Sequence, residues 1–395
     1  MKQNENSLLK YVDRRGSSSA KWDALTENYS RDDLLPLWVA DMDFAVDSNI
    51  TDALTEYIKS GVYGYYRVPD SYYDAFISWE KKYHSLDVDR AHIRFSAGVV
   101  SGTNLALQTL TWPDDSVMVS TPVYYPFLHA ITNNDRKLVE SELISEDGIY
   151  RIDFEDFERR IVENNVRAYI LCSPHNPVSR VWTRSELAKL LDICRRHGVA
   201  VISDEIHHDF VYGDNVHTPT LSLAEAEDRI IMLTAASKSF NIAGLQNSLV
   251  VIPNNEVRDA WDSVVVKSRI GQGNTLGYIA TEAAYRYGRP WLEELKAVIT
   301  NNYDCIKREL VERYKGLVIS PLEGTYLAWM DFGEYVTAED LKSFMEDKCG
   351  LAFDYGDWFG GTESTTHIRI NLATSLDNIK EMIRRVSREL DALRE

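Results

Sequence analysis

The sequence predicts an α/β fold, with a large domain built on a mostly parallel sheet flanked by helices and a smaller α+β domain after it. Two observations carry this prediction. Residues 168–234 alternate short apolar runs with an amphipathic helical pattern, which indicates a βαβ unit and therefore parallel strands. Residues 289–395 change pattern, and several short strands there are interspersed with helical stretches, as in a separate α+β domain.

The length of 395 residues exceeds that of an ordinary single-core domain. We expect an N-terminal segment over residues 1–48 that packs with the small domain, a large domain over 49–288 and a small domain over 289–395. The second boundary lies where Gly288 and Pro290 punctuate the chain.

Composition excludes several classes of protein. The 43 Lys+Arg against 61 Asp+Glu give a net charge of −18, which disfavours nucleic acid as a partner. The four cysteines form no C-x-x-C pair, which favours a reduced, cytoplasmic compartment. The polar residues 1–6 predict no secretory signal. No apolar run approaches the roughly 18 residues that a membrane helix needs, so no membrane association is expected.

Two early elements could contribute to a binding site. A strand from Ile93 leads through Gly98 into a helix, and the free N–H groups at such a helix N-terminus can bind a phosphate. This signal is weak by itself, because most such turns are ordinary helix caps. The loop Thr121–Phe127 carries adjacent tyrosines between two prolines and could offer a ring for stacking.

The middle of the chain gives the clearest pattern. Apolar runs over 168–173, 199–203 and 229–234 predict three buried strands. Between the first two, Thr183 stands three residues before Glu186, which is a capping-box spacing, and an apolar helix face follows.

The residue pattern of the C-terminal part predicts short strands and helices. Residues 316–320 and 325–331 have the pattern of strands, and a helix is expected over 338–348. A further strand is expected near 367–371. A final helix follows it, with an apolar face that begins at Ile379.

Polar side chains follow each of the three central strands, where a parallel sheet binds its ligands. Asn176 follows the first strand, Asp204 and His207 follow the second, and Lys238 follows the third beside Ser237. A lysine in partly apolar surroundings has a lowered pKa. Together with a phosphate site and a stacking ring, a lysine and a carboxylate are what pyridoxal 5′-phosphate requires of its protein.

Nine motifs lie in order along nearly the whole chain: Lys21–Asp23, Val39–Phe44, Ala97–Val100, Thr121–Phe127, Ser173–Pro177, Ser203–His207, Ser237–Gly244, Glu323–Leu327 and Arg369–Leu372. In this order and spacing the chain resembles the fold-type I pyridoxal-phosphate enzymes. More closely, it is similar to the MalY/PatB-type C–S β-lyases, which include cystathionine β-lyases and cystalysin.

The resemblance implies a role for each matching residue around the cofactor. Lys238 would bind pyridoxal phosphate covalently and, with Tyr124, serve in catalysis. The other contacts would be Asp204 at the pyridinium nitrogen, Asn176 and His207 at the phenolic oxygen, Tyr124 stacked on the ring, and Gly98, Val99, Val100 and Ser237 at the phosphate.

It also implies how substrate and a second subunit would be bound. Arg369 would bind the substrate α-carboxylate bidentately, and Asn176 and Tyr125 would be further substrate contacts. Tyr65 would reach the phosphate of the partner subunit's site, which implies a homodimer with active sites at the subunit interface.

The implied activity is a lyase that cleaves cystathionine- or cysteine-type S-conjugates by α,β-elimination to a thiol, pyruvate and ammonia. The preferred thiol is open. The alternatives are an aminotransferase of the same fold and a secondary role as a regulator that binds a transcription factor. Many aminotransferases of this fold carry a phosphate-binding arginine eight residues after the lysine, and here Gln246 stands there, which favours the lyase.

Other sites receive less support from the sequence. His207, His208 and Asp209 are adjacent, so their side chains point apart, and no third ligand has suitable spacing; we therefore expect no metal site. Neither G-x-G-x-x-G after a strand nor G-K-[ST] occurs, which excludes the common dinucleotide and P-loop motifs. Taken singly, Tyr124 and Tyr125 could be core residues and Arg369 a member of a surface ion pair, although these are the less favoured interpretations.

Overall fold

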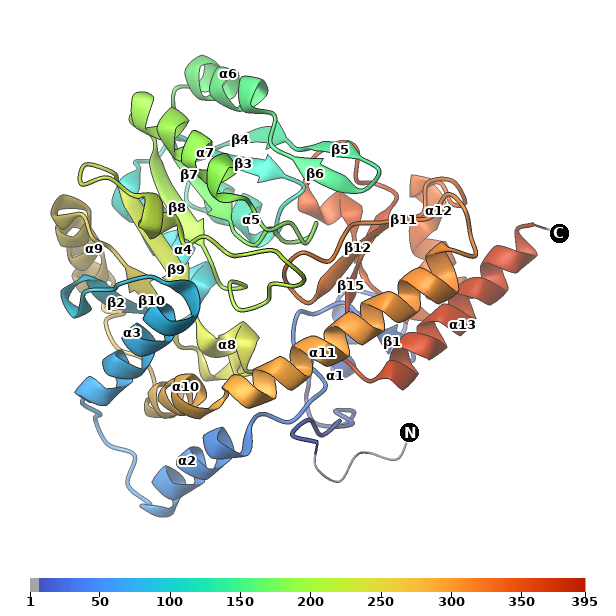
Figure 1. Cartoon of the computed structure of the whole chain (residues 1–395), viewed down its shortest axis with the longest axis horizontal. Coiled ribbons are helices and arrows are strands. Elements are labelled where there is room, and N and C mark those ends of the chain that lie inside the picture. Colours follow the sequence, from blue (N-terminus) through green and yellow to red (C-terminus); the bar gives the residue numbers. More distant parts are fainter. Residues whose placement is uncertain (1–6, 395) are drawn as a thin grey trace.

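The computed structural model describes residues 7–394 and centres on a seven-stranded sheet (Figure 1). Residues 1–6, whose polar character predicts no secretory signal, lie outside the described residues. In spatial order the strands are β2 (Ile93–Ser96), β10 (Ser248–Val251), β9 (Ile230–Thr234), β8 (Ala200–Asp204), β7 (Val166–Cys172), β3 (Ser116–Thr121) and β4 (Lys137–Glu142). Strand β10 is antiparallel to both neighbours, and the other pairings are parallel. The prediction of a mostly parallel sheet is confirmed.

Alternating residues of the strands point to two separate helical layers. On β3, Val117 and Val119 pack with α4 (Val99–Leu110), α5 (Pro126–Asn133) and α9 (Asn255–Ser268). Met118, between them, packs toward α6 (Phe154–Asn164) and α7 (Arg184–Arg196) on the other face. Helix α7 begins with the expected capping box of Thr183 and Glu186. Helices therefore cover both faces, so the central strands are buried throughout.

A four-stranded antiparallel sheet forms the C-terminal part. Its order is β11 (Val318–Ile319), β12 (Leu327–Asp331), β15 (His367–Asn371) and β14 (Asp354–Tyr355). The long helices α11 (Arg289–Ile306) and α13 (Leu376–Ala392) lie against each other beside it (Figure 1). The helix expected over 338–348 is α12 (Ala338–Ser343), which continues as a π-helical turn. The domain boundaries themselves remain predictions.

The N-terminal segment is held against the C-terminal sheet. Strand β1 (Leu35–Pro36) pairs in parallel with β13 (Leu351–Ala352). The side chains of Lys21 and Asp43 form an ion pair of 2.9 Å that is fully buried, and Thr374 donates a hydrogen bond to the same carboxylate. Because a buried charge needs its partner, these contacts fix the segment that runs past Ala40.

The remaining α-helices and a β-hairpin lie outside these sheets. They are α1 (Ala20–Asp23), α2 (Ser48–Lys59), α3 (Asp70–His84), α8 (Ala236–Ser239), α10 (Thr275–Tyr287) and the hairpin of β5 (Ile144–Glu146) with β6 (Ile149–Arg151). Helix α10 packs against both α2 and α3. Within residues 7–394, no helix combines the length and apolar character needed to cross a membrane.

Candidate active site

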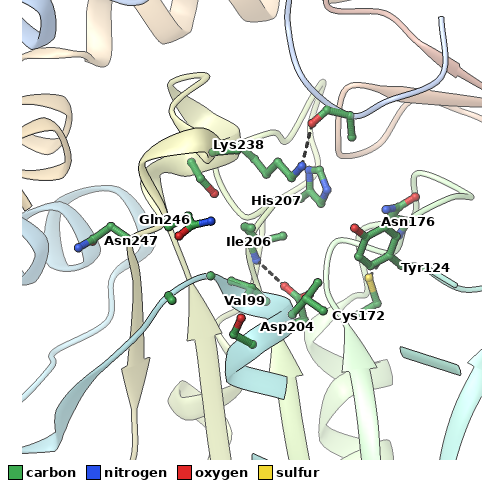
Figure 2. Close-up of a pocket in the computed structure, with 17 residues that line it drawn as sticks. Val99, Tyr124, Cys172, Asn176, Asp204, Ile206, His207, Lys238, Gln246 and Asn247 are labelled. Carbon is green, nitrogen blue, oxygen red and sulfur yellow. Dashed lines mark hydrogen bonds between the residues drawn. The ribbon is translucent and has the colours of Figure 1, made fainter. Parts of the chain in front are cut away.

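A cavity of about 290 Å³ opens at the carboxyl ends of β7 and β8, as expected for a parallel sheet (Figure 2). Its walls include Asp204 of β8, Cys172 at the end of β7, and residues of α4 and α8. The predicted residues that line it are Gly98, Val99, Val100, Tyr124, Asn176, Asp204, His207, Ser237 and Lys238. Segments spread over 140 positions of the chain therefore converge on one place.

Lys238 projects from the short helix α8, which directly follows β9. Its Nζ donates a hydrogen bond of 2.7 Å to the main-chain carbonyl oxygen of Ala40. Burial, helped by the positive charge of Arg369, lowers the pKa of Lys238 to about 8. A much larger fraction of this amine than of an exposed lysine is therefore neutral, and hence nucleophilic or basic, near neutral pH.

Asp204 ends β8 at the bottom of the cavity in Figure 2. Its Oδ1 accepts a hydrogen bond of 3.0 Å from the N–H of Ile206. Burial raises the pKa of Asp204 to about 7, although this hydrogen bond and the charge of Lys238 oppose the rise. A carboxyl in this state is suited to a ligand that brings a cationic N–H.

His207 and Tyr124 add ring systems to the walls. His207 is buried, and its Nδ1 has no hydrogen-bond partner among the described residues. Burial lowers the pKa of His207 well below its usual value, so the imidazole is neutral. Burial likewise raises the pKa of the Tyr124 hydroxyl, which stays protonated. An unpartnered buried nitrogen is costly, and a ligand in the cavity can satisfy it.

Gly98 makes the helix N-terminus accessible from the cavity. It precedes the first residue of α4 with φ 146° and ψ 158°, a conformation that L side chains rarely adopt. The next residues, Val99 and Val100, line the cavity with the first N–H groups of the helix, which have no partner within the helix. Ser237 and Gln246 lie on the other side. The arrangement suits a phosphate.

These donors fit pyridoxal phosphate. The cavity presents a weakly basic amine, a carboxyl that gains from a cation, an unpartnered imidazole nitrogen and a helix N-terminus. They correspond to the aldehyde, the ring nitrogen, the phenolic oxygen and the phosphate of that molecule. The specific role of each residue stays a prediction.

Arg369 lies on β15 and is almost fully buried. Its Nη1 donates a hydrogen bond of 2.9 Å to Oδ1 of Asn176, and its Nη2 forms an ion pair with Asp354. Nε has no partner among the described residues. Arg369 is not part of the cavity wall itself, but Asn176 joins it to that wall.

The other two predicted residues lie further out. Tyr125 is half-buried and packs edge-on against Trp358 and Phe359 beyond the cavity. The side chain of Tyr65 is fully exposed and borders a separate hollow with Tyr57 and other residues. Their contacts with substrate and with a partner subunit therefore remain predictions.

Sequence reasoning assigned no role to several residues of the site. Ala40 lies in a quoted motif, but its contribution is a main-chain oxygen, which no side-chain pattern reveals. Asp354 faces Arg369 from a two-residue strand outside the motifs. Asn247 and Cys172 line the cavity, and only their closeness to Gln246 and to the end of a strand could have indicated them.

The chain is similar to characterised proteins over nearly its full length. The family described as aminotransferase class I and II matches residues 37–386. Cystathionine β-lyase PatB of Bacillus subtilis is 37% identical over 384 residues, which cover 96% of this chain and 99% of PatB. Protein MalY of Escherichia coli is 34% identical, covering 82% of this chain and 83% of MalY.

Solved structures show the same likeness in three dimensions. Cystalysin from Treponema denticola, which contains pyridoxal 5′-phosphate, superposes with a TM-score of 0.93 at 34% identity, covering 98% of this chain and 99% of cystalysin. The pyridoxal-phosphate-bound C–S lyase from Staphylococcus hominis gives a TM-score of 0.89 at 32% identity, covering 98% of this chain and 97% of the lyase.

Proposed function

Because the chain belongs to the aminotransferase class I and II family and has the fold of its pyridoxal-phosphate enzymes, we propose that it is a carbon–sulfur β-lyase. The substrate would be cystathionine or a related cysteine S-conjugate, and the products a thiol, pyruvate and ammonia. The observation that carries the proposal is the amine of Lys238, with its pKa lowered to about 8, in the wall of a cavity that also contains Asp204. The relatives named cystathionine β-lyase and C–S lyase support this choice of reaction.

Different residues of the chain have different roles in the elimination. When bound, pyridoxal phosphate supplies a ring that withdraws electrons from the substrate Cα. Asp204 would hold the cofactor at its ring nitrogen and would favour the protonated, electron-poor form of the ring. Nζ of Lys238, in its neutral form, takes the proton from Cα. The Cβ–S bond then breaks, and the sulfur leaves with its electron pair as a thiolate.

Arg369 positions the substrate for this proton transfer. Its guanidinium is fixed by Asn176 and Asp354, and Nε is still unpartnered. A planar guanidinium binds a carboxylate bidentately, which would orient the Cα–H bond toward Lys238. The hydroxyl of Tyr124, protonated because burial raises its pKa, can donate to the departing sulfur.

A homodimer in the cytoplasm completes the proposal. Val62, Tyr63 and Tyr65 expose between 65% and 108% of their side-chain surface on one segment. Adjacent exposed apolar side chains favour an interface, which here would place Tyr65 at the partner's phosphate site. All four cysteines are buried and free, which suits a reducing compartment.

Product analysis tests the reaction. The purified enzyme with pyridoxal phosphate is incubated with cystathionine and no oxo acid, and pyruvate, ammonia and homocysteine are quantified. We expect the three in equal amounts, because elimination releases one thiol from each substrate and one water then hydrolyses the remaining three-carbon fragment to one pyruvate and one ammonia. Turnover that requires an added oxo acid and yields no free thiol would instead identify an aminotransferase.

A further inference from the structure

Three histidines and three carboxylates gather in the core beside the active site. They are Glu80, His84, Glu205, His208, Asp209 and His217. The cluster joins the C-terminal end of α3 to the loop that follows β8 and to a later loop. None of the six lines the cavity that contains Lys238, so the proposed reaction leaves them without a function.

Glu80 is the anomaly in this cluster. Its side chain is 0% exposed, and neither carboxyl oxygen has a hydrogen-bond partner among the described residues. The nearest basic atom, Nε2 of His208, lies 3.6 Å from Oε1, which is too long for a hydrogen bond. A carboxyl in this position lacks a cation.

The two histidines nearest Glu80 are oriented by partners on one side. Nδ1 of His208 lies 3.2 Å from the hydroxyl of Thr234, which leaves Nε2 facing Glu80. The same Nε2 also lies 3.6 Å from Oδ2 of Asp209. His84 is paired with Asp209 at 2.9 Å, and the imidazole centroids of His84 and His208 are 4.1 Å apart. A histidine fixed by a carboxylate or hydroxyl on one nitrogen is the usual supporting arrangement of a metal ligand.

The geometry points to a binding site for one Zn²⁺-type divalent metal ion, held by Glu80, His84 and His208. One donor atom from each residue can be chosen such that all three lie within 4.8 Å of one another. Two imidazoles and one carboxylate are a ligand set that Zn²⁺ accepts, with a fourth position for water. The ion would supply the positive charge that the buried Glu80 lacks.

A second group of three, Glu205, His208 and His217, meets the same distance criterion. Its carboxylate, however, is already occupied: Glu205 accepts hydrogen bonds from the N–H of Thr220 at 2.9 Å and from Ser203 at 2.8 Å, and it pairs with His217 at 2.8 Å. The unpartnered carboxyl of Glu80 therefore favours the first group.

A route from solvent reaches the cluster. A surface hollow of about 550 Å³ is bordered by Tyr83, His84 and His217. An ion can thus approach His84 from outside the active-site cavity. The spacing of residues around His208 and Asp209 in the sequence does not reveal this site. His84 is 125 positions away from Asp209 in the chain, and only the packing of α3 brings the two together.

Zinc binding to the holoenzyme tests the proposal. The protein is treated with a chelator, incubated with zinc chloride and desalted; retained zinc is measured by mass spectrometry and its affinity by competition with a chromophoric chelator. We expect about one zinc ion per chain. Glu80→Gln and His208→Asn should each weaken zinc binding about 10- to 100-fold. His197→Gln is the matched control, because His197 pairs with Glu158 at the surface and should bind zinc normally.

Wild-type protein that retains no zinc would overturn the proposal, as would unchanged affinity in either variant. Loss of zinc in Glu205→Gln with full binding in Glu80→Gln would also overturn it, in favour of the second group. The cofactor absorbance and circular dichroism of each variant show whether it is folded. Thermal unfolding gives an independent readout, because zinc should raise the midpoint of the wild type and of His197→Gln but not of His208→Asn.

Discussion

The Nζ atom of Lys238 lies 2.7 Å from the carbonyl oxygen of Ala40, a residue 198 positions earlier in the chain. The hydroxyl of Tyr326 donates to the same oxygen, also at 2.7 Å. The amine is therefore held by the N-terminal segment and not by the sheet from which Lys238 projects. This contact fixes where the free amine lies when it is not bonded to the cofactor.

Replacing Lys238 with alanine should abolish turnover. Because the variant has no lysine amine to take the proton from the substrate Cα, pyruvate release should fall by at least about 10³-fold. The bound-cofactor absorbance should change as well, since the covalent link is lost. Lys267→Ala is the control, because Lys267 is exposed on α9 and should leave both signals unchanged. Full C–S cleavage by Lys238→Ala would refute the assignment of the base.

The uptake of pyridoxal phosphate by the apoprotein should depend on pH through Lys238. Only the neutral amine reacts with the aldehyde, and the pKa is lowered to about 8 from 10.5. The rate should therefore rise as pH increases through about 8 and level off above it. Stopped-flow absorbance measures this rate, and a midpoint near that of an exposed lysine would contradict the lowered pKa.

Asp204→Asn should have opposite effects on stability and on activity. Burial raises the pKa of Asp204 to about 7 from 3.8, so the folded apoprotein keeps a proton that the unfolded chain loses between these pH values. The free energy of unfolding of the apoprotein therefore falls as pH rises through that window. Asparagine does not titrate, so the Asp204→Asn variant should not show this fall. Urea midpoints across pH measure the effect. Activity should fall about 10²- to 10³-fold; an unchanged rate would exclude the role at the ring nitrogen.

Arg369→Ala should raise KM for cystathionine by about 10²-fold and leave the cofactor bound. It should also lower the free energy of unfolding by about 3–5 kcal/mol, because Asp354 stays buried without its cation. Adding Asp354→Asn should restore part of the stability but not KM. An unchanged KM in Arg369→Ala would argue against the carboxylate contact.

Tyr65→Ala and Lys238→Ala should complement each other if the active sites are shared between subunits. Tyr65→Ala alone should be weakly active, and Lys238→Ala alone should be inactive. After mixing, unfolding and refolding, hybrid dimers contain one intact site, since the lysine of one chain meets the tyrosine of the other. With random pairing, half of the dimers are hybrids and each hybrid has one of its two sites intact, so the mixture should show about a quarter of the wild-type activity. Activity no higher than that of the parents would place Tyr65 outside the partner's site.

Sequence reasoning found the site where the side chain carries the chemistry. Asn176 and Lys238 follow strands, and Asp204 ends one, whose bounds the apolar pattern predicts to within two residues. Parallel pairing of these strands then brings the three side chains together. The contribution of Ala40 was missed because it comes from the main chain. Glu80 was missed because only helix packing brings it to His208.

The acceptor for Lys238 is a peptide oxygen, so replacing the side chain of Ala40 does not remove it. Ala40→Gly should therefore be tolerated as long as the Lys21–Asp43 ion pair keeps the segment in place. Trimming the chain from its start past this position removes the acceptor and should disable the enzyme. Deletion series and substitution scans will thus disagree about the same position, and both results will be correct.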